Sequence, residues 1–188
     1  MKRIIVFTAI FFGLCYSAAA QVDSSLEQLR LKMAESASVM NYEYSLSLAG
    51  VKTTGTGVLT VQDKVYKMQG NGLKLSCDGS SVCVVDEAAK EIFIESVAQG
   101  DDAFLSNPAL LFANLNTVFT VSDPVRKGGE MVFNLTPKKA CGLDSGTVTL
   151  NTTGVVPVFV SGLFKITDGG QLDVKIKSMT FVEKKPLT

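Results

Sequence analysis

The sequence contains no histidine and no tryptophan among its 188 residues. The absence of histidine excludes Ser/His/Asp and Cys/His nucleophilic triads, histidine-ligated catalytic zinc and the most common general base of enzymes. Positive charge is not in excess, because 18 Lys and Arg residues are balanced by 18 Asp and Glu residues. Proteins that bind nucleic acid use surplus basic residues to neutralise phosphates, so nucleic acid is not an expected partner. Most familiar enzyme chemistry is excluded, and we expect a protein without catalytic residues.

A long hydrophobic run is missing everywhere except at the N-terminus. Lys2 and Arg3 form a basic start, Ile4–Leu14 an apolar stretch, and Ala18–Ala20 a small-residue cleavage site, which together are typical of a secretory signal. The apolar stretch is shorter than the roughly 20 residues that a membrane-spanning helix needs. We therefore expect residues 1–20 to be a signal peptide and residues 21–188 to form a single exported domain.

Cysteines are few, and only Cys77, Cys83 and Cys141 remain after the expected cleavage. An oxidising compartment favours one disulfide, for which three pairings are open. Cys77 and Cys83 flank an Asp78-Gly79 turn, so a Cys77–Cys83 disulfide across adjacent strands is the favoured prediction. No C-x-x-C pair occurs, and scattered cysteines without histidine make a poor zinc site, so no metal and no cofactor are expected.

The mature chain begins with a helical pattern and then changes to a strand pattern. Ser24 to Glu27 form a capping box, and apolar residues then recur at helical spacing to about Val39. From Met40 to Leu48 apolar and polar residues alternate, which predicts a strand. Further strands are predicted at 57–61, 65–68, 73–77, 82–85, 91–97, 120–121, 131–135, 147–150, 155–166 and 172–181. Glycine and asparagine turns separate them, so we expect a sequential antiparallel meander, with Glu183–Pro186 as a solvated tail.

One apolar segment, residues 100–115, interrupts the strands. Asn107 and Pro108 fit the cap and first residue of a short helix, and the residues that follow make it strongly apolar. A sheet of about 10–11 strands curls, and its concave apolar face needs cover. We therefore predict an α+β fold: an unclosed antiparallel half β-barrel with an N-terminal helix and a short lid helix over an apolar cavity. The alternative is a fully packed core without a cavity, and the periodicity of the sequence does not distinguish the two.

The order of several short motifs resembles the periplasmic outer-membrane lipoprotein carrier family, LolA. The motifs are the N-terminal helix, Tyr42–Leu46, Gly55–Val61, the Cys77-Asp78-Gly79 hairpin ending in Val85-Asp86, Asn107–Leu111 and Phe133–Pro137. The resemblance implies a periplasmic protein that binds the acyl chains of lipoproteins in its cavity and shuttles them toward the outer membrane. It also implies acylated lipoproteins or lipid as ligands, with an inner-membrane release complex and an outer-membrane receptor as protein partners. A monomer is expected.

The chain departs from this family at three places. Carriers have an Arg-Pro pair after the Gly-x-Leu-x-Val strand, whereas here Gly57–Lys64 contains neither residue. Cys83 and Val85 replace the aromatic pair after the Asp-Gly turn, and the C-terminal extension of longer carriers is missing. In the carriers this arginine helps to hold the lid closed, and Gly57–Lys64 of this chain has no residue that matches it.

Candidate lipid-binding residues are the large apolar side chains of the strands and of the lid, with core packing as the alternative for each. They are Tyr42, Tyr44, Leu46, Tyr66, Met68, Phe93, Met131 and Phe133 from strands, and Phe104, Leu110, Leu111, Phe112 and Leu115 from the lid.

Two other functions compete with a carrier. A lipid- or lipoprotein-sensing module of the same fold, of the envelope-stress regulator type, would detect its ligand without transporting it. A glycosidase-like enzyme would use paired carboxylates, for which Asp86, Glu87, Asp101 and Asp102 are the candidates. Their positions at a hairpin turn and before a helix explain these charges without catalysis.

Overall fold

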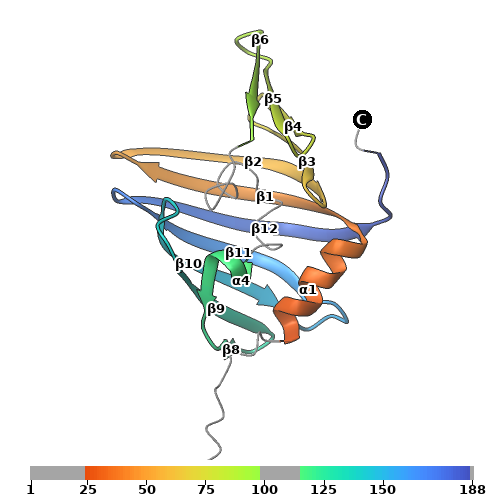
Figure 1. The fold of residues 1–188 in the computed structure, drawn as a ribbon, viewed down its shortest axis with the longest axis vertical. Coiled ribbons are helices and arrows are strands. Elements are labelled where there is room, and N and C mark those ends of the chain that lie inside the picture. Colours follow the sequence, from red (N-terminus) through yellow and green to blue (C-terminus); the bar gives the residue numbers. More distant parts are fainter. Residues whose placement is uncertain (1–23, 98–114, 187–188) are drawn as a thin grey trace, which may run out of the picture.

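The computed structural model describes residues 24–97 and 115–186, and one antiparallel sheet of 12 strands dominates it (Figure 1). The helices are α1 (Ser24–Glu35) and α4 (Leu115–Val118). The strands are β1 (Ala37–Leu48), β2 (Val51–Gln62), β3 (Val65–Gly70), β4 (Leu73–Cys77), β5 (Ser81–Asp86), β6 (Glu91–Ser96), β7 (Phe119–Val121), β8 (Val125–Lys127), β9 (Glu130–Pro137), β10 (Leu143–Asn151), β11 (Val158–Ile166) and β12 (Gly170–Val182).

The sheet consists of two meanders joined at its centre. The strand order is β6-β5-β4-β3-β2-β1-β12-β11-β10-β9-β7, with β8 paired to β9 off this path. The predicted sequential meander is therefore wrong at two points. Strand β1 pairs with the last strand, β12, as well as with β2, and β7 pairs with β9 rather than with β8. In the described residues β6 and β7 form the two ends of the sheet and do not pair with each other, which confirms the predicted unclosed barrel.

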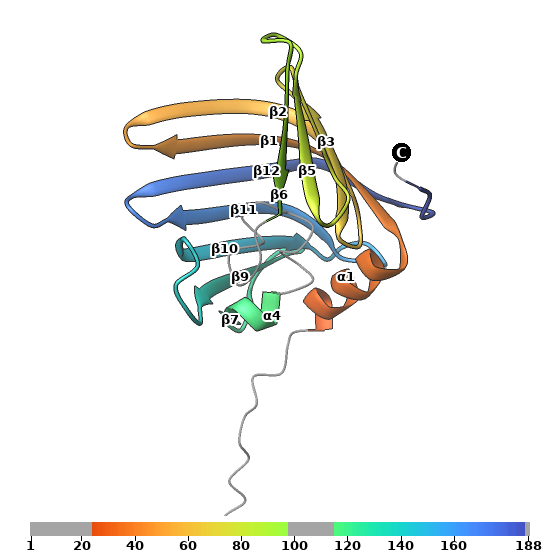
Figure 2. The ribbon, with the colours of Figure 1, turned by 45° about the horizontal axis from the view of Figure 1, so that its top comes forward.

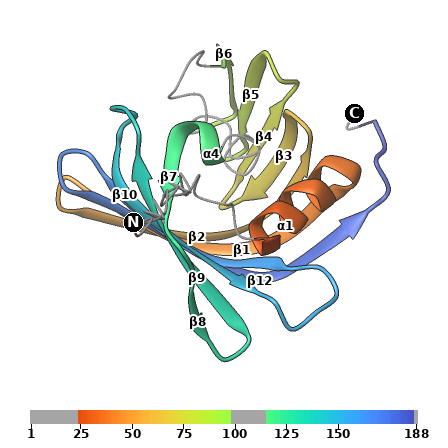
Figure 3. The same ribbon diagram turned by 60° about the horizontal axis from the view of Figure 1, so that its bottom comes forward.

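The sheet curves strongly, so that β3–β6 run steeply across the direction of the remaining strands (Figure 2). Figure 3 shows α1 and α4 on the same, concave side of this curved sheet. We call this side the inner face and the opposite side the outer face. The N-terminal helix is confirmed, whereas the lid helix predicted over 107–115 lies outside the described residues except for its last position. Among the described helices, none combines the length and the apolar character needed to span a bilayer.

Helix α1 ends earlier than its apolar stripe predicts. The last helical hydrogen bond runs from the Ser36 amide to the Lys32 carbonyl at 3.1 Å, and β1 begins at Ala37. Ala37 already pairs with Val182 of β12, and Ser38 pairs with Val61 of β2. Pairing with two neighbouring strands outweighs the weak helix propensity of the segment around Val39, because tertiary contacts override such preferences.

The hydrophobic core lies between the inner face and the two helices. Leu26 and Leu29 of α1 are buried there, together with Leu115 of α4. On the sheet, the most deeply buried side chains come mainly from β9 and β10, including Phe133, Val148 and Leu150. Burial of these apolar side chains is the main source of stability, at roughly 25 cal/mol per Å² of apolar surface removed from water.

One buried polar group lacks a hydrogen bond. The Ser38 side chain is 0% exposed, and its hydroxyl finds no partner among the described residues. An unsatisfied buried hydroxyl costs about 1–3 kcal/mol. We expect Ser38→Ala to raise the free energy of unfolding by about 1 kcal/mol, measured by urea denaturation; Ser36→Ala, at a second buried serine, is the comparison. A loss of stability on Ser38→Ala would show that the hydroxyl is satisfied.

The predicted Cys77–Cys83 disulfide is not formed. In the β4–β5 hairpin Cys77 pairs with Val82, and Cys83 pairs with Ser76. The two cysteines therefore lie on opposite faces of the sheet, because successive side chains along a strand alternate between faces. No disulfide joins the cysteines of the described part of the chain, and Cys77 Sγ instead accepts a hydrogen bond from the Gly79 amide at 3.3 Å.

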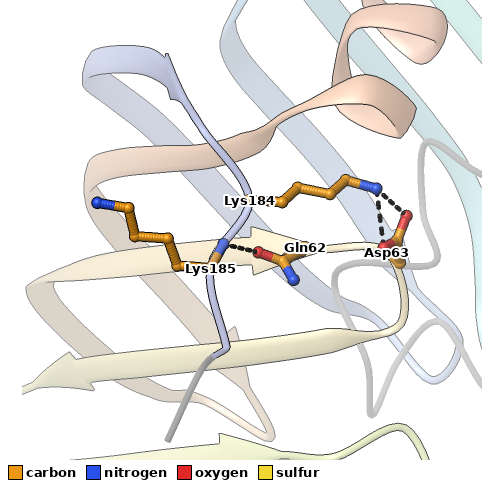
Figure 4. Close-up of polar contacts among 4 residues, drawn as sticks. All are labelled: Gln62, Asp63, Lys184 and Lys185. Carbon is orange, nitrogen blue, oxygen red and sulfur yellow. Dashed lines mark hydrogen bonds and ion pairs between the residues drawn. The ribbon is translucent and has the colours of Figure 1, made fainter.

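The C-terminal tail was predicted to be solvated, but two of its residues bind the end of β2 and the β2–β3 turn. Lys184 Nζ lies 2.7 and 2.8 Å from the two carboxylate oxygens of Asp63 (Figure 4). The Lys185 amide donates to Gln62 Oε1 at 3.1 Å. These contacts hold the chain beyond β12 against the end of β2.

Candidate functional site

An apolar cavity of about 390 Å³ opens on the inner face of the sheet. Its volume falls within the range of about 300–1,000 Å³ typical of small-ligand pockets. Side chains from α1, β1–β4 and β10–β12 and from the turn between β3 and β4 surround it. They are Met33, Met40, Tyr42, Tyr44, Thr56, Leu59, Met68, Gly70, Asn71, Leu73, Leu75, Leu143, Phe159, Phe164, Ile166, Leu172, Val174 and Ile176.

The register of the central strands explains why these residues meet. Tyr44 of β1 pairs with Val174 of β12, and Tyr42 pairs with Ile176 after a bulge at Asn41/Tyr42. The alternation of β12 therefore places Leu172, Val174 and Ile176 on the cavity side, since residues two apart share one face. Two long neighbouring strands with matching alternation supply the cavity floor.

Glycines of β2 leave the space that the tyrosine rings occupy. Gly57 pairs with Tyr42, and Gly55 pairs with Tyr44. A Cβ atom at Gly57 would lie 2.6 Å from the Tyr42 hydroxyl oxygen and 2.5 Å from the Gln69 carbonyl oxygen. Both distances are shorter than atoms tolerate, so the rings depend on glycine at these positions.

We expect Gly57→Ala to lower the free energy of unfolding by about 1–3 kcal/mol, because overpacking forces side chains and backbone to shift. Gly154→Ala is the matched control, since a Cβ atom there meets only Val156 O at 3.5 Å. Thermal unfolding of both variants is the measurement. Equal midpoints for the two variants would contradict the close packing of Tyr42 over Gly57.

Polar groups gather at one end of the otherwise apolar lining. Asn71 Nδ2 donates to the Tyr44 hydroxyl at 3.4 Å, and Asn71 Oδ1 accepts from the Thr56 amide at 3.4 Å. Asn71 and Gly72 both have positive φ, 52° and 78°, as a two-residue type I′ hairpin turn requires. The β3–β4 turn thus places the side-chain amide of Asn71 at the rim of the cavity.

Burial disfavours the ionised form of two tyrosines on the inner face, Tyr42 and Tyr66. Burial raises the pKa of Tyr42 above its usual value, and the neighbouring Tyr44 adds to the effect. Burial raises the pKa of Tyr66 to about 12, with a smaller contribution from Cys77. Among the described residues, no Asp, Glu, Lys or Arg lines the cavity, which favours an apolar ligand.

The structure separates the residues predicted to bind lipid into distinct environments. Tyr42, Tyr44 and Met68 line the cavity. Tyr66, Met131, Phe133 and Leu115 are buried in the core instead, whereas Phe93 is 48% exposed on β6. Leu46 is half-buried on β1 and is not among the lining residues. Phe104, Leu110, Leu111 and Phe112 lie outside the described residues.

Several lining residues escaped the sequence prediction. Phe159, Phe164 and the β12 residues Leu172, Val174 and Ile176 belong to predicted strands but were not assigned to the cavity. The alternation of residues 172–176 is a readable signal, but pairing between the first and last strands is not. Asn71 is signalled by its Asn-Gly pair, the strongest short hairpin motif.

The carboxylates of the enzyme hypothesis have structural roles where the structure describes them. Asp86 Oδ1 accepts hydrogen bonds from the Ala88 and Ala89 amides, both at 2.9 Å, and so closes the β5–β6 turn. Glu87 pairs with Lys74 at 2.5 Å. Asp101 and Asp102 lie outside the described residues.

No protein-family model and no curated protein matches the chain. Similar solved structures include a LolA superfamily protein from Nitrosomonas europaea, which belongs to the family that the sequence resembles. It has a TM-score of 0.45 and 11% identity over 87% of this chain and 94% of that one. A putative outer membrane lipoprotein-sorting protein domain from Vibrio parahaemolyticus has a TM-score of 0.40 and 12% identity over 87% and 94%. MucB in complex with the periplasmic part of MucA has a TM-score of 0.38 and 12% identity over 88% and 58%. At these values the likeness says nothing about ligand or partner.

Proposed function

We propose that this protein binds the acyl chains of lipoproteins in its inner-face cavity and carries them through the periplasm toward the outer membrane. The observation that carries the proposal is the cavity itself. It is lined almost entirely by aliphatic, aromatic and methionine side chains, and it contains no charged side chain among the described residues. Such a lining suits a hydrocarbon chain.

The hydrophobic effect supplies enough free energy for transient binding. Each methylene removed from water contributes about 0.8 kcal/mol, so a chain of ~16 carbons gains at most ~13 kcal/mol before ordering costs. The few polar groups lie at one rim, around Asn71 and Tyr44. A carrier with few hydrogen bonds to its cargo also releases it readily, because no directional contacts need to break.

A series of saturated acyl ligands tests this proposal. We expect affinity to rise about fourfold per added methylene, the equivalent of ~0.8 kcal/mol, until the chain fills the cavity and the gain stops. Isothermal titration with acylated and unacylated forms of one short peptide gives the binding constants. Equal affinity for the two forms would contradict acyl binding.

Transfer distinguishes a carrier from a lipid-sensing module. We expect the loaded protein to release an acylated peptide to acceptor vesicles faster than the peptide moves between vesicles without protein. Binding without accelerated transfer would favour the sensing module.

A further inference from the structure

Strand β6 forms a free edge of the sheet. It pairs with β5 on one side, and in the described part of the chain nothing pairs with its other side. All six of its residues are exposed, including Ile92 at 67% and Ile94 at 73%. In Figure 1 this strand stands at the outer limit of the molecule. An exposed apolar edge is a template for pairing with another chain, and proteins normally protect it.

The hydrogen-bonding pattern shows which backbone groups face outward. The Val97 amide donates to the Ser80 carbonyl at 2.8 Å, which makes these two residues a hydrogen-bonded pair. Hydrogen-bonded and non-hydrogen-bonded pairs alternate in an antiparallel ladder, so Glu91, Phe93 and Glu95 also bond to β5. The N–H and C=O groups of Ile92 and Ile94 therefore point away from the sheet. Within β6, these two residues also have the most exposed apolar side chains.

The two faces of β6 differ in character. Phe93 pairs with Val84, which pairs with Leu75 of the cavity lining, so Phe93 lies on the inner face. Glu91 and Glu95 share that face, because they lie two residues on either side of Phe93. Ile92 and Ile94 are on the outer face, where a groove extends from Ile94 across Cys83 to Val65 and Pro186.

The carboxylates of Glu91 and Glu95 favour a partner strand with basic side chains. Neither Glu91 nor Glu95 has an ion pair among the described residues. In the antiparallel register that sets Ile92 of one copy of β6 opposite Ile94 of another, Glu91 of each copy would oppose Glu95 of the other. Like charges directly opposite each other destabilise a strand pair, so a second copy of this chain fits poorly in this register. Basic residues four positions apart fit well.

We propose that β6 is a docking edge for an extended polypeptide segment of another protein that adds to the sheet as a further strand. The segment carries Lys or Arg opposite Glu91 and Glu95 and apolar side chains opposite Ile92 and Ile94. Main-chain hydrogen bonds supply affinity and the alternating side chains supply specificity, as in other cases of strand addition. This docking is independent of the acyl-binding proposal.

Two capped synthetic peptides test the docking edge: Lys-Val-Phe-Val-Lys, and its acidic counterpart Glu-Val-Phe-Val-Glu. With the basic peptide we expect amide hydrogen exchange at Ile92 and Ile94 to slow at least about fivefold. The amides of Glu91, Phe93 and Glu95 should change little, because they already bond to β5. The acidic peptide should leave all five amides unchanged.

Reversing the charges of β6 tests whether the preference for the basic peptide comes from Glu91 and Glu95. The double variant Glu91→Lys, Glu95→Lys should bind the acidic peptide and lose the basic one, whereas Asp123→Lys, at an exposed acid outside the strands, should behave as the wild type. Ile94→Pro, which removes one outward amide, should weaken binding of the basic peptide at least about tenfold; edge strands tolerate proline at such positions.

Three outcomes would overturn the proposal. One is unchanged exchange at Ile92 and Ile94 with saturating basic peptide. Another is equal binding of both peptides to the wild type and the charge-swapped protein. The third is concentration-dependent dimerisation that protects the same amides, which would make a second copy the occupant. Acyl-ligand binding, measured in parallel, should remain unchanged in every variant.

Discussion

Val174→Asp should weaken binding of a 16-carbon acyl ligand by at least about 100-fold, the equivalent of about 2.7 kcal/mol. Val174 lies on the cavity floor between Tyr44 of β1 and Gly162 of β11. A carboxylate there would be covered by the bound hydrocarbon without any partner, and burying an unpaired charge costs several kcal/mol. Without ligand the half-buried side chain keeps contact with water, so the fold should persist. Equilibrium titration is the measurement.

Val58→Asp is the matched control for this substitution. Val58 follows Gly57 on β2 and therefore points to the outer face, where it is exposed. The same change of side chain should leave acyl affinity within about twofold of the wild type, because it touches no ligand. If Val58→Asp and Val174→Asp weaken binding equally, the ligand does not occupy the inner-face cavity.

Phe133→Ala should lower the free energy of unfolding by about 3–5 kcal/mol, the usual cost of deleting a buried phenylalanine. Phe133 of β9 is 0% exposed, pairs with Val148 of β10 and belongs to the core. A small domain has only about 5–15 kcal/mol of stability, so this loss is a large part of the total. Urea denaturation monitored by circular dichroism gives the change.

Phe93→Ala is the comparison, because both phenylalanines are lipid-binding candidates on sequence grounds. Phe93 is half exposed on the edge strand, so its loss should cost less than about 1 kcal/mol. Acyl affinity of folded Phe133→Ala protein should stay close to the wild-type value. Nearly unchanged stability with strongly weakened binding would instead place Phe133 in the cavity.

Local patterns in the sequence predict the individual elements well. The capping box at Ser24 places the start of α1, and the alternation after Met40 predicts β1. The end of α1 and the pairing of β1 with β12 depend on contacts between residues about 140 positions apart, such as Ala37 with Val182. No local pattern encodes such pairing, so the sheet order is only partly predictable.

The same limit explains the mixed outcome for the candidate site. Alternation shows that Tyr42 and Phe133 each lie on an apolar face, but it does not distinguish cavity from core. That distinction depends on what covers each part of the inner face. Tyr42 lies in the open part over Gly57, whereas Phe133 lies in the fully buried part. The Asp78-Gly79 turn predicts Cys77 and Cys83 on adjacent strands, but the register places them on opposite faces.

The most direct test of the central claim is native mass spectrometry of the protein purified from a Gram-negative periplasm, followed by organic extraction of any bound species. The account predicts an acyl-containing adduct that is lost in Val174→Asp and retained in Val58→Asp. A bare chain that also fails to bind added fatty acid or triacylated peptide at micromolar concentration would contradict it.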